Sequence, residues 1–209
     1  MKLEFSLNMI SVIVTLYNQE NTIISALQSL VAQTAQQWEC VIVDNASSDA
    51  SEHQVRSYLI DRRMRYIRLE HHISIKEARE IGLQNTSGEW IIFVDAADYL
   101  KSNALQALYL AVKTYGTKCG AGNYGVVRDG EIKPHSYDPA GKIYQKDVAK
   151  GKLSVVTGAS IFSREIADQP ESWKEHDFAY TDHLILISGE ESEPLVEEDN
   201  RPWWKKIFN

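Results

Sequence analysis

The chain has 209 residues, of which 44% are hydrophobic and 24% are charged, and its formal net charge is -7. Such a composition is typical of a soluble globular domain, and the acidic balance argues against nucleic acid as a partner, because phosphate backbones require a basic surface. The first eight residues lack the apolar core of a signal peptide, and no stretch approaches the roughly 20 apolar residues of a membrane-spanning helix. We therefore expect a cytoplasmic protein whose two cysteines, Cys40 and Cys119, stay reduced and buried.

The first half of the chain alternates short apolar runs with segments of helical periodicity. The apolar runs predict four strands, at residues 9–16, 38–43, 65–69 and 90–94. Helices are predicted between and after them, from residue 20, after residue 48, over 74–84 and over 100–115. Repeated strand–helix units of this length predict an α/β fold with a mostly parallel central sheet and helices on both faces.

The second half has a different pattern. Residues 122–127 and the run from Ile132 flank Asp129-Gly130, which predicts a hairpin, and residues 153–162 predict a further strand. No linker composition separates the two halves. We therefore expect a mixed, partly antiparallel C-terminal portion built onto the parallel sheet.

Polar side chains follow three of the predicted strands. They are Thr15 with Tyr17, Asp44 with Asn45, and Asp95 with Asp98. The carboxyl ends of parallel strands meet at one edge of the sheet, where open α/β proteins bind ligands. These loops predict a site at that edge. The alternative is a solvated loop in which Asp98 caps the next helix.

The first loop, Leu16 to Glu20, contains no glycine, which argues against a dinucleotide-binding fingerprint. The P-loop and the nucleophile elbow are also missing from the sequence, and no Cys/His cluster has zinc spacing. The site must then act through side-chain donors and acceptors. Asp95 could hold ribose hydroxyls or a divalent cation, and Arg79 could face phosphates or pair with an acid. In outline, this is a nucleotide diphosphate site.

Three long segments resemble the family 2 glycosyltransferases in order and spacing: SVIVTLYNQENTIISALQSLVAQT (11–34), WECVIVDNASSD (38–49) and KEAREIGLQNTSGEWIIFVDAAD (76–98). Two later segments are similar to the family more weakly, TGASIFSREI (157–166) and EPLVEEDNRPW (193–203). The resemblance implies the GT-A fold. It also implies a single domain, 1–209, in which residues 9–115 bind the nucleotide-sugar and 116–209 form the acceptor-binding half and tail.

The same resemblance implies an inverting transfer of sugar from a nucleotide-sugar, a UDP-sugar being the expected donor, to a hydroxyl of a saccharide or lipid-linked acceptor. A carboxylate would act as general base, and Mn²⁺ or Mg²⁺ would neutralise the departing diphosphate. Carried over by position, the donor-binding residues are Thr15, Tyr17, Asp44, Asn45, Arg79 and Asp95.

Several positions depart from the family pattern. The second acid of its D-x-D motif is Ala97 here, so the expected metal pair is Asp95 with Asp98. Asn45 replaces the usual Asp, where its carbonyl could accept from a uracil N–H, and Glu80 stands where the family has Asn.

The general base is expected late in the chain, in an E-D-x-x-L-type segment on a helix. The best match is Asp182, in Thr181-Asp182-His183-Leu184, with Glu175 and Asp177 as rivals. A hydrogen bond between the base and the acceptor hydroxyl is what this role requires.

Two alternatives stay open on sequence grounds. Residues 201–208 mix aromatic and basic side chains, which suits either a peripheral contact with the inner face of the membrane or a tail that packs on its own domain. The loss of the acid at Ala97 also favours a catalytically degenerate member of the family, one that binds a nucleotide or saccharide or serves in an assembly.

Overall fold

The computed structural model describes residues 9–128, 131–135, 140–148, 157–169 and 172–188. The first half consists of β1 (Ile10–Leu16), α1 (Ile23–Val31), β2 (Trp38–Asp44), α2 (Ser51–Arg56), the 3-10 turn η1 (Ser57–Ile60), β3 (Met64–Arg68), α3 (Ile75–Gln84), β4 (Trp90–Asp95), β5 (Asp98–Leu100) and α4 (Ala104–Tyr115). The second half consists of β6 (Cys119–Arg128), β7 (Glu131–His135), β8 (Gly141–Ile143), α5 (Gln145–Val148), η2 (Thr157–Ala159), β9 (Ser160–Ser163), α6 (Arg164–Ala167), η3 (Ser172–Glu175) and β10 (Phe178–Ser188).

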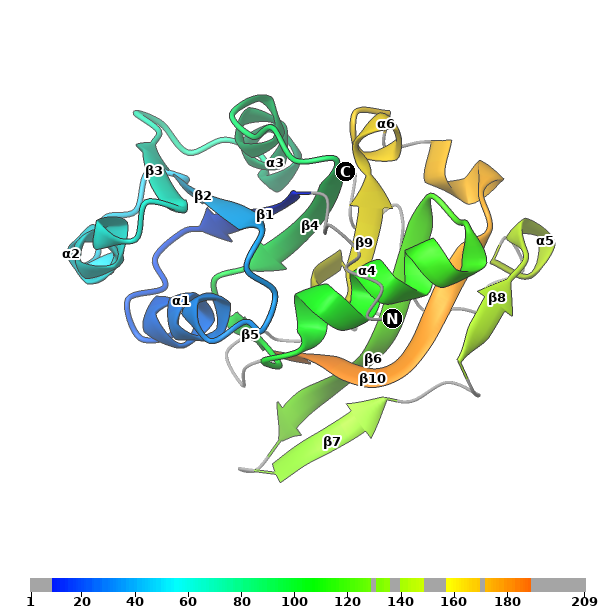
Figure 1. The fold of residues 1–209 in the computed structure, drawn as a ribbon. Coiled ribbons are helices and arrows are strands. Elements are labelled where there is room, and N and C mark those ends of the chain that lie inside the picture. The colour runs from blue at the N-terminus through cyan, green and yellow to red at the C-terminus, as the bar shows by residue number, and fades with distance from the viewer. Residues whose placement is uncertain (1–8, 129–130, 136–139, 149–156, 170–171, 189–209) are drawn as a thin grey trace, which may run out of the picture.

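All the described strands join one sheet, in the order β3-β2-β1-β4-β9-β6-β10-β5, with β7 beside β6 and β8 beside β10 (Figure 1). Strands β1 to β4 pair in parallel, as do β6 and β10, whereas β9, β7, β8 and β5 pair antiparallel with their neighbours. The predicted α/β class, with a mostly parallel sheet and a mixed C-terminal portion, is confirmed.

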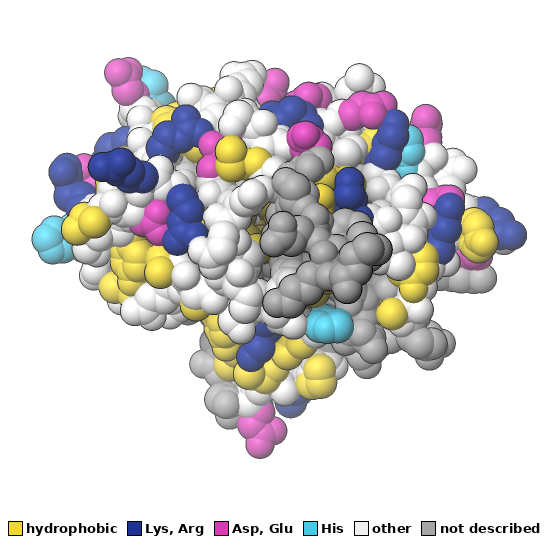
Figure 2. Space-filling view, in the orientation of Figure 1, with side chains coloured by type: hydrophobic (Ala, Val, Ile, Leu, Met, Phe, Trp, Pro, Cys, Tyr) yellow, Lys and Arg dark blue, Asp and Glu magenta, His cyan; other side chains and the backbone are white. Residues whose placement is uncertain are grey.

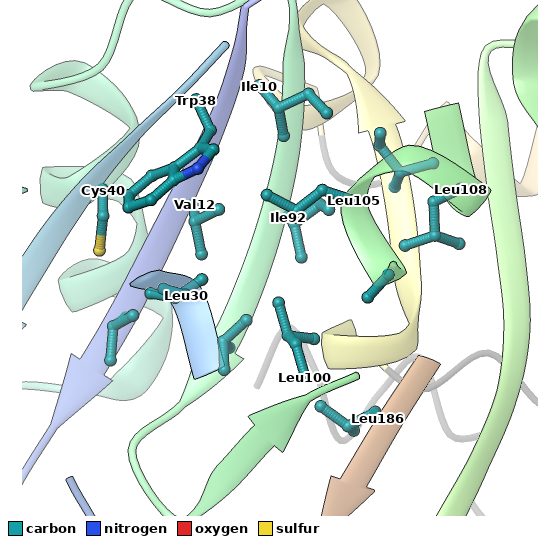
Figure 3. Packing of buried hydrophobic residues seen from close by; sticks show 14 of the residues in the cluster. Ile10, Val12, Leu30, Trp38, Cys40, Ile92, Leu100, Leu105, Leu108 and Leu186 are labelled. Atoms are coloured by element: carbon teal, nitrogen blue, oxygen red, sulfur yellow. The ribbon is translucent and has the colours of Figure 1, made fainter. Parts of the chain in front are cut away.

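Different helices pack on the two faces of the sheet, because successive side chains of a strand point to opposite faces. Ile10 and Val12 of β1 pack with Leu30 of α1 and Leu105 of α4 in the larger core (Figure 3). Ile13 points the other way, into a cluster below α3 and α6. Helices therefore cover both faces, as the strand–helix repeat predicted.

Helix α3 lies unusually close to the sheet. A Cβ on Gly82 would be only 2.3 Å from Ile13 Cγ2, and Ala78 is completely buried. The helix begins with a capping box, in which the Ser74 hydroxyl and the Glu77 carboxylate each accept a hydrogen bond from the other's backbone N–H. These local features fix α3 over β1 and β2, and so place Arg79 at the functional edge of the sheet.

The structure corrects several boundaries. The first helix begins at Ile23 rather than near residue 20, and Asp98 begins β5 instead of capping a helix. Residues 157–159 form a 3-10 turn before the short strand β9, while 153–156 lie outside the described residues. Cys40 and Cys119 are free and buried, as expected, and burial raises the pKa of the Cys119 thiol to about 12.

Basic side chains gather at the left of Figure 2, over α2 and β3. Four of these arginines lie beside acids, in the pairs Arg56–Glu52, Arg63–Asp61, Arg65–Glu39 and Arg68–Glu52. The positive charge of this surface is therefore largely neutralised within the protein.

Candidate active site

The carboxyl ends of β1, β2 and β4 form one wall of a cavity of about 390 Å³. The register aligns them, because Thr15 of β1 lies opposite both Val43 of β2 and Asp95 of β4. Five of the residues around the cavity are Thr15, Tyr17, Asn45, Asp95 and Ala97. The structure thus brings four of the six predicted donor-binding residues to one cavity.

Asp95 is the polar centre of this edge. Its Oδ1 accepts hydrogen bonds from Thr15 Oγ1 at 2.9 Å and from Arg79 Nη2 at 3.1 Å. The Asp95 side chain is 44% exposed, whereas that of Arg79 is only 9% exposed. A nearly buried guanidinium requires such a carboxylate, because an uncompensated buried charge is strongly destabilising. Of the two roles left open for Arg79, the ion pair with an acid is the one present.

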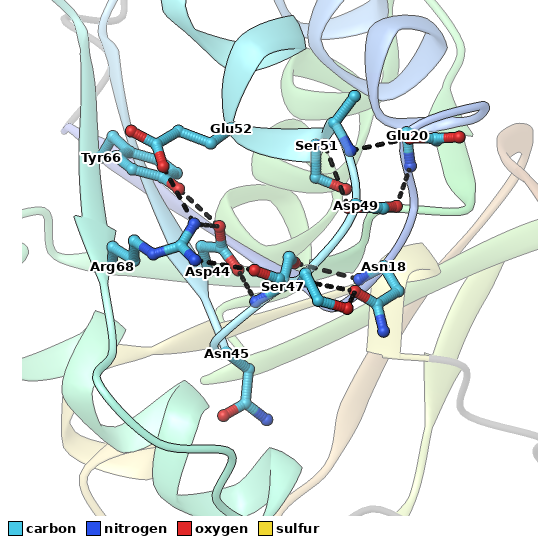
Figure 4. A network of polar contacts seen from close by, with 12 residues as sticks. Asn18, Glu20, Asp44, Asn45, Ser47, Asp49, Ser51, Glu52, Tyr66 and Arg68 are labelled. Carbon is cyan, nitrogen blue, oxygen red and sulfur yellow. Dashed lines mark hydrogen bonds and ion pairs between the residues drawn. The ribbon is translucent and has the colours of Figure 1, made fainter.

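Asp44 lies inside the protein rather than on the cavity wall. It is 0% exposed, and its carboxylate accepts hydrogen bonds from the Ser47 N–H at 2.8 Å and the Tyr66 hydroxyl at 2.5 Å (Figure 4). Burial, together with the Asp44 carboxylate, raises the pKa of the Tyr66 hydroxyl. Arg68 Nη1 lies 3.4 Å from Asp44 and 2.9 Å from Glu52. This network holds the loop after β2 in place.

The loops after β1 and β2 are bound to one another. The Asn18 N–H donates to Ser47 Oγ at 3.0 Å, and the Ser48 N–H donates to Asn18 Oδ1 at 2.8 Å (Figure 4). Asn18 and Ala46 both adopt left-handed backbone conformations, with φ of 52° and 63°. The turn that carries Tyr17 is therefore rigid without any glycine.

Both polar atoms of the Asn45 side-chain amide form hydrogen bonds within the protein. Its Nδ2 donates to the Ile73 carbonyl at 2.8 Å, and its Oδ1 accepts from the Ile73 N–H at 2.9 Å. Asn45 is only 5% exposed, although it lines the cavity. In this arrangement the residue positions the loop before α3, and its amide edge is not presented to a uracil.

His72 is a cavity residue that the sequence reasoning missed. Its ring centroid lies 4.1 Å from that of Tyr17 at an interplanar angle of 44°, and its Nδ1 lies 3.2 Å from the Asn45 carbonyl oxygen. The two rings together form an aromatic surface at the mouth of the cavity. Nothing in the sequence signals this pair, since it depends on a loop held by Asn45 from another strand.

The two predicted metal ligands are placed differently. Asp95 lines the cavity, whereas Asp98 begins β5, is 8% exposed, and is not among the cavity's described lining residues. Within the described ranges, no group of three or more His, Cys, Asp or Glu side chains could hold a metal ion. One carboxylate supplemented by substrate phosphates is a donor set that suits Mg²⁺ or Mn²⁺. Asp95 is the carboxylate that the described cavity offers to such a cation.

Asp182 lies in a strand, so the expectation of a helix at this segment is wrong. It sits in β10 between Thr181, opposite Gly122, and Leu184, opposite Asn123, where the register with β6 shifts. Strand β10 is three places from β4 in the sheet, about 14 Å at ordinary strand spacing.

The two rival acids lie elsewhere. Asp177 binds Lys142 Nζ at 2.8 Å and accepts from the Gln145 N–H at 2.9 Å, and the Lys142 ammonium lowers the pKa of this carboxyl. Glu175 belongs to η3, before β10. Both precede Phe178, which lies opposite Cys119 at the amino end of β6, away from the edge that carries Asp95.

The arrangement of strands and helices defines a GT-A-type fold. The structure matches that of S. aureus TarS 1–349 in complex with UDP-GlcNAc with a TM-score of 0.75 at 19% identity, over 87% of this chain and 58% of TarS 1–349. The family model "Glycosyl transferase family 2" matches residues 11–169. The chain belongs to this family.

Curated relatives agree with the family. Glycosyltransferase GlyA of Streptococcus pneumoniae is 35% identical over 116 residues, covering 55% of this chain and 16% of GlyA. The Escherichia coli enzyme WfgD, named UDP-Glc:alpha-D-GlcNAc-diphosphoundecaprenol beta-1,3-glucosyltransferase, is 28% identical over 158 residues, covering 74% of this chain and 62% of WfgD. The chain thus spans less than two thirds of the length of each relative. Among the described residues, no helix is long and apolar enough to cross a membrane.

Proposed function

We propose that the protein is an inverting glycosyltransferase that transfers a sugar from a UDP-sugar to a hydroxyl of a saccharide or lipid-linked acceptor. The observation that carries this proposal is the cavity where the Tyr17–His72 aromatic pair lies beside the Asp95–Arg79 ion pair. An aromatic surface suits a nucleobase, and carboxylate oxygens suit ribose hydroxyls. The names of WfgD and of the TarS complex support a UDP-sugar donor.

Each residue then has a role that its contacts support. Tyr17 and His72 stack the base, Thr15 and Arg79 hold Asp95 in position, and Asp95 binds the ribose and the cation. A divalent cation bound with the nucleotide would supply Lewis-acid stabilisation of the departing diphosphate.

Asp182 is the proposed general base. It takes the proton of the acceptor hydroxyl while that oxygen attacks the anomeric carbon, and UDP leaves from the opposite face with inversion. Residues 9–115 supply the donor half in this scheme, and 116–209 supply the acceptor half.

We also propose that the protein is cytoplasmic, with a peripheral contact at the inner face of the membrane as the way in which it would meet a lipid-linked acceptor. The lipid-linked acceptor in the name of WfgD supports this location. The segment 201–208, on which the predicted membrane contact rests, lies outside the described residues.

A calorimetric titration tests the proposal. UDP and GDP are titrated separately into the full chain, with Mn²⁺ and with EDTA, and hydrolysis of UDP-glucose and UDP-GlcNAc is measured in parallel. Cation-enhanced UDP binding with turnover of one donor is the expected result. Failure of every nucleotide to bind would overturn the proposal.

The second candidate, a degenerate family member that binds without turnover, is favoured by Ala97 and by Asp98 lying off the cavity wall. Binding of UDP with no hydrolysis or transfer in the same experiment would support it.

A further inference from the structure

The loop before α3 has little buried surface of its own. Residues 70–72 and 74 are exposed, and Ile73 is only partly buried, in the small cluster between β2 and α3. The Asn45 side chain reaches this loop from the end of β2, and Figure 4 shows it pointing away from the polar network around Asp44. A segment with so few buried apolar contacts depends on hydrogen bonds such as these for its position.

The amide of Asn45 can pair with Ile73 in one direction only. Its Nδ2 donates to the Ile73 carbonyl, while its Oδ1 accepts from the Ile73 N–H. If the nitrogen and oxygen were exchanged, two oxygens would face one another and so would two N–H groups. The amide is therefore matched to this peptide group, and a carboxylate at the same position could form only one of the two bonds.

The loop carries the ring that lies against Tyr17. His72 Nδ1 lies 3.2 Å from the Asn45 backbone oxygen, and the centroids of the His72 and Tyr17 rings are 4.1 Å apart. Tyr17 is 45% exposed, so a ring packed against it limits the directions that its own ring can take. Asn45 thus sets the position of His72, and His72 sets that of Tyr17.

Direct reading of the base by position 45 is the alternative. Uracil presents an N–H at N3, which an acceptor could bind, whereas cytosine presents an acceptor at N3. Asn45 directs both polar atoms at Ile73 and is nearly buried, which favours an indirect role. An aromatic surface such as the Tyr17–His72 pair accepts different bases, because every base has a π-face.

We propose that Asn45 is a positioning residue, which acts on the nucleobase through the His72–Tyr17 surface. Position 45 then governs how tightly a base stacks and not which base is selected. The proposal rests on the proposed use of a nucleotide-sugar and describes how that nucleotide is recognised. An acid at position 45, the usual residue of the family, should weaken nucleotide binding in this chain, because its second oxygen would face the Ile73 carbonyl.

Calorimetry on the full chain with Mn²⁺ tests the proposal, with UDP and CDP as separate probes. Asn45→Asp should bind both about tenfold more weakly, the order of effect of one stacking contact, with the UDP-to-CDP affinity ratio unchanged within about twofold. His72→Ala should show a similar loss. The double variant should then bind no more than about twofold more weakly than His72→Ala, because both changes act on one contact.

Asn85→Asp is the matched control and should bind both nucleotides like the wild type. The Asn85 Nδ2 also donates to a carbonyl at 2.8 Å, that of Ile81, but it lies at the opposite end of α3 from Ser74 and the cavity. The control therefore makes the same chemical change, with the same added charge, away from the loop.

Proton NMR at pH 8, where an ordinary histidine is neutral, reports the loop without any nucleotide. The signal of His72 among the six histidines is assigned by its absence from His72→Ala. In the wild type the Tyr17 ring current should displace this signal. Asn45→Asp and Asn45→Ala should both return it toward the position of a free imidazole, whereas Asn85→Asp should not. Thermal melts identify the variants that are folded, and the nearly isosteric Asp serves if the Ala variant does not fold.

Several results would overturn the proposal. They are undiminished or tighter UDP binding in Asn45→Asp, a changed UDP-to-CDP ratio, additive losses in the double variant, and an unmoved His72 signal. If no nucleotide binds to any of the proteins while the His72 signal moves as expected, the donor proposal fails and the hold of Asn45 on His72 stands.

Discussion

In the first half of the chain, β1, β2 and β3 are parallel and each is followed by a helix, whereas in the second half β6 and β10 run for 10 and 11 residues and take antiparallel neighbours. The first arrangement brings several loops to one edge, and they form the cavity lined by Thr15, Asn45 and Asp95. The second extends the sheet sideways, and the segment expected to carry the base becomes a strand. The proposed donor end of the protein is thus set by repeated local units, while the proposed acceptor end depends on pairing between distant segments.

The largest effect is expected at the acceptor end. Asp182→Asn should lower the rate of transfer by about 10²–10⁴-fold, because a general base contributes that much, while leaving UDP affinity unchanged. The measurement is the initial rate of UDP release from UDP-glucose in the presence of a methyl glycoside supplied as acceptor. Asp177→Asn is the control, since that acid is paired with Lys142. A wild-type rate in Asp182→Asn would show that Asp182 is not the general base.

At the donor end, Asp95→Ala should weaken UDP binding by about 100-fold, because it removes the cavity carboxylate and leaves Arg79 nearly buried and unpaired. Asp95→Asn retains an oxygen that can accept from Thr15 and should lose less. Calorimetry with UDP and Mn²⁺ gives both affinities. If Asp95→Ala binds UDP as tightly as the wild type does, Asp95 has only a structural role.

Arg164→Ala tests the contact between α6, in the second half of the chain, and the end of α3, in the first half. Losing three hydrogen bonds from a charged group should lower the free energy of unfolding by about 3 kcal/mol. For a domain of this size, that corresponds to a fall in Tm of roughly 6–12 °C. Arg62→Ala, at an exposed position, is the control and should melt like the wild type. Equal melting temperatures for the two variants would show that α6 is held by packing alone.

The loss of stability at low pH should depend on Glu39, which lies at the amino edge of the sheet in the first half of the chain. Burial of Glu39 acts to raise its pKa, but hydrogen bonds from the Ser87 and Gly88 N–H groups and the Ser11 hydroxyl hold the pKa below 4.5. A lowered folded-state pKa gives stability that is present above pH 4.5 and lost as pH falls through that lowered value. Glu39→Gln should therefore show less acid-induced loss of stability than wild type between pH 6 and 3, measured as Tm. An identical pH profile would contradict the assignment.

The smallest effect is expected at Ala46, which has a left-handed φ of 63°. Ala46→Gly should raise the free energy of unfolding by about 0.5–1 kcal/mol, because glycine adopts this conformation without the strain of a Cβ. Urea denaturation gives the value. Asn18→Gly, at φ 52°, is the control and should lose stability, since the Asn18 side chain accepts from Ser48.

The fold could be predicted because its signals are local. The apolar runs that became β1, β2 and β4, and the Ser74–Glu77 pattern that begins α3, are contained in short windows. The small residues Ala78 and Gly82 of α3, which let the helix pack closely on the sheet, also lie within one short window. The convergence of Thr15 with Asp95 followed from strand direction alone.

The rest depended on tertiary pairing. The bonds of Asn45 to Ile73, and the stacking of His72 on Tyr17 that follows, join three separate loops and leave no pattern in the sequence. The burial of Asp44 arises from Tyr66 and Arg68 on the neighbouring strand. Asp182 was expected on a helix because a motif match carries no information on strand pairing. Its strand is specified by β6, β8 and β5, which come from elsewhere in the chain.

Strand β3 ends the sheet, and this position bears on how the protein behaves at high concentration. An edge strand offers backbone groups to which a strand of another molecule could add, and natural proteins discourage such addition with charge. Arg65 and Arg68 lie on this short strand, where each meets an acid of its own chain, and Arg62 precedes it. Removing these charges to simplify the surface for crystallisation would invite edge-to-edge aggregation, so surface engineering is better directed at α4 or α1.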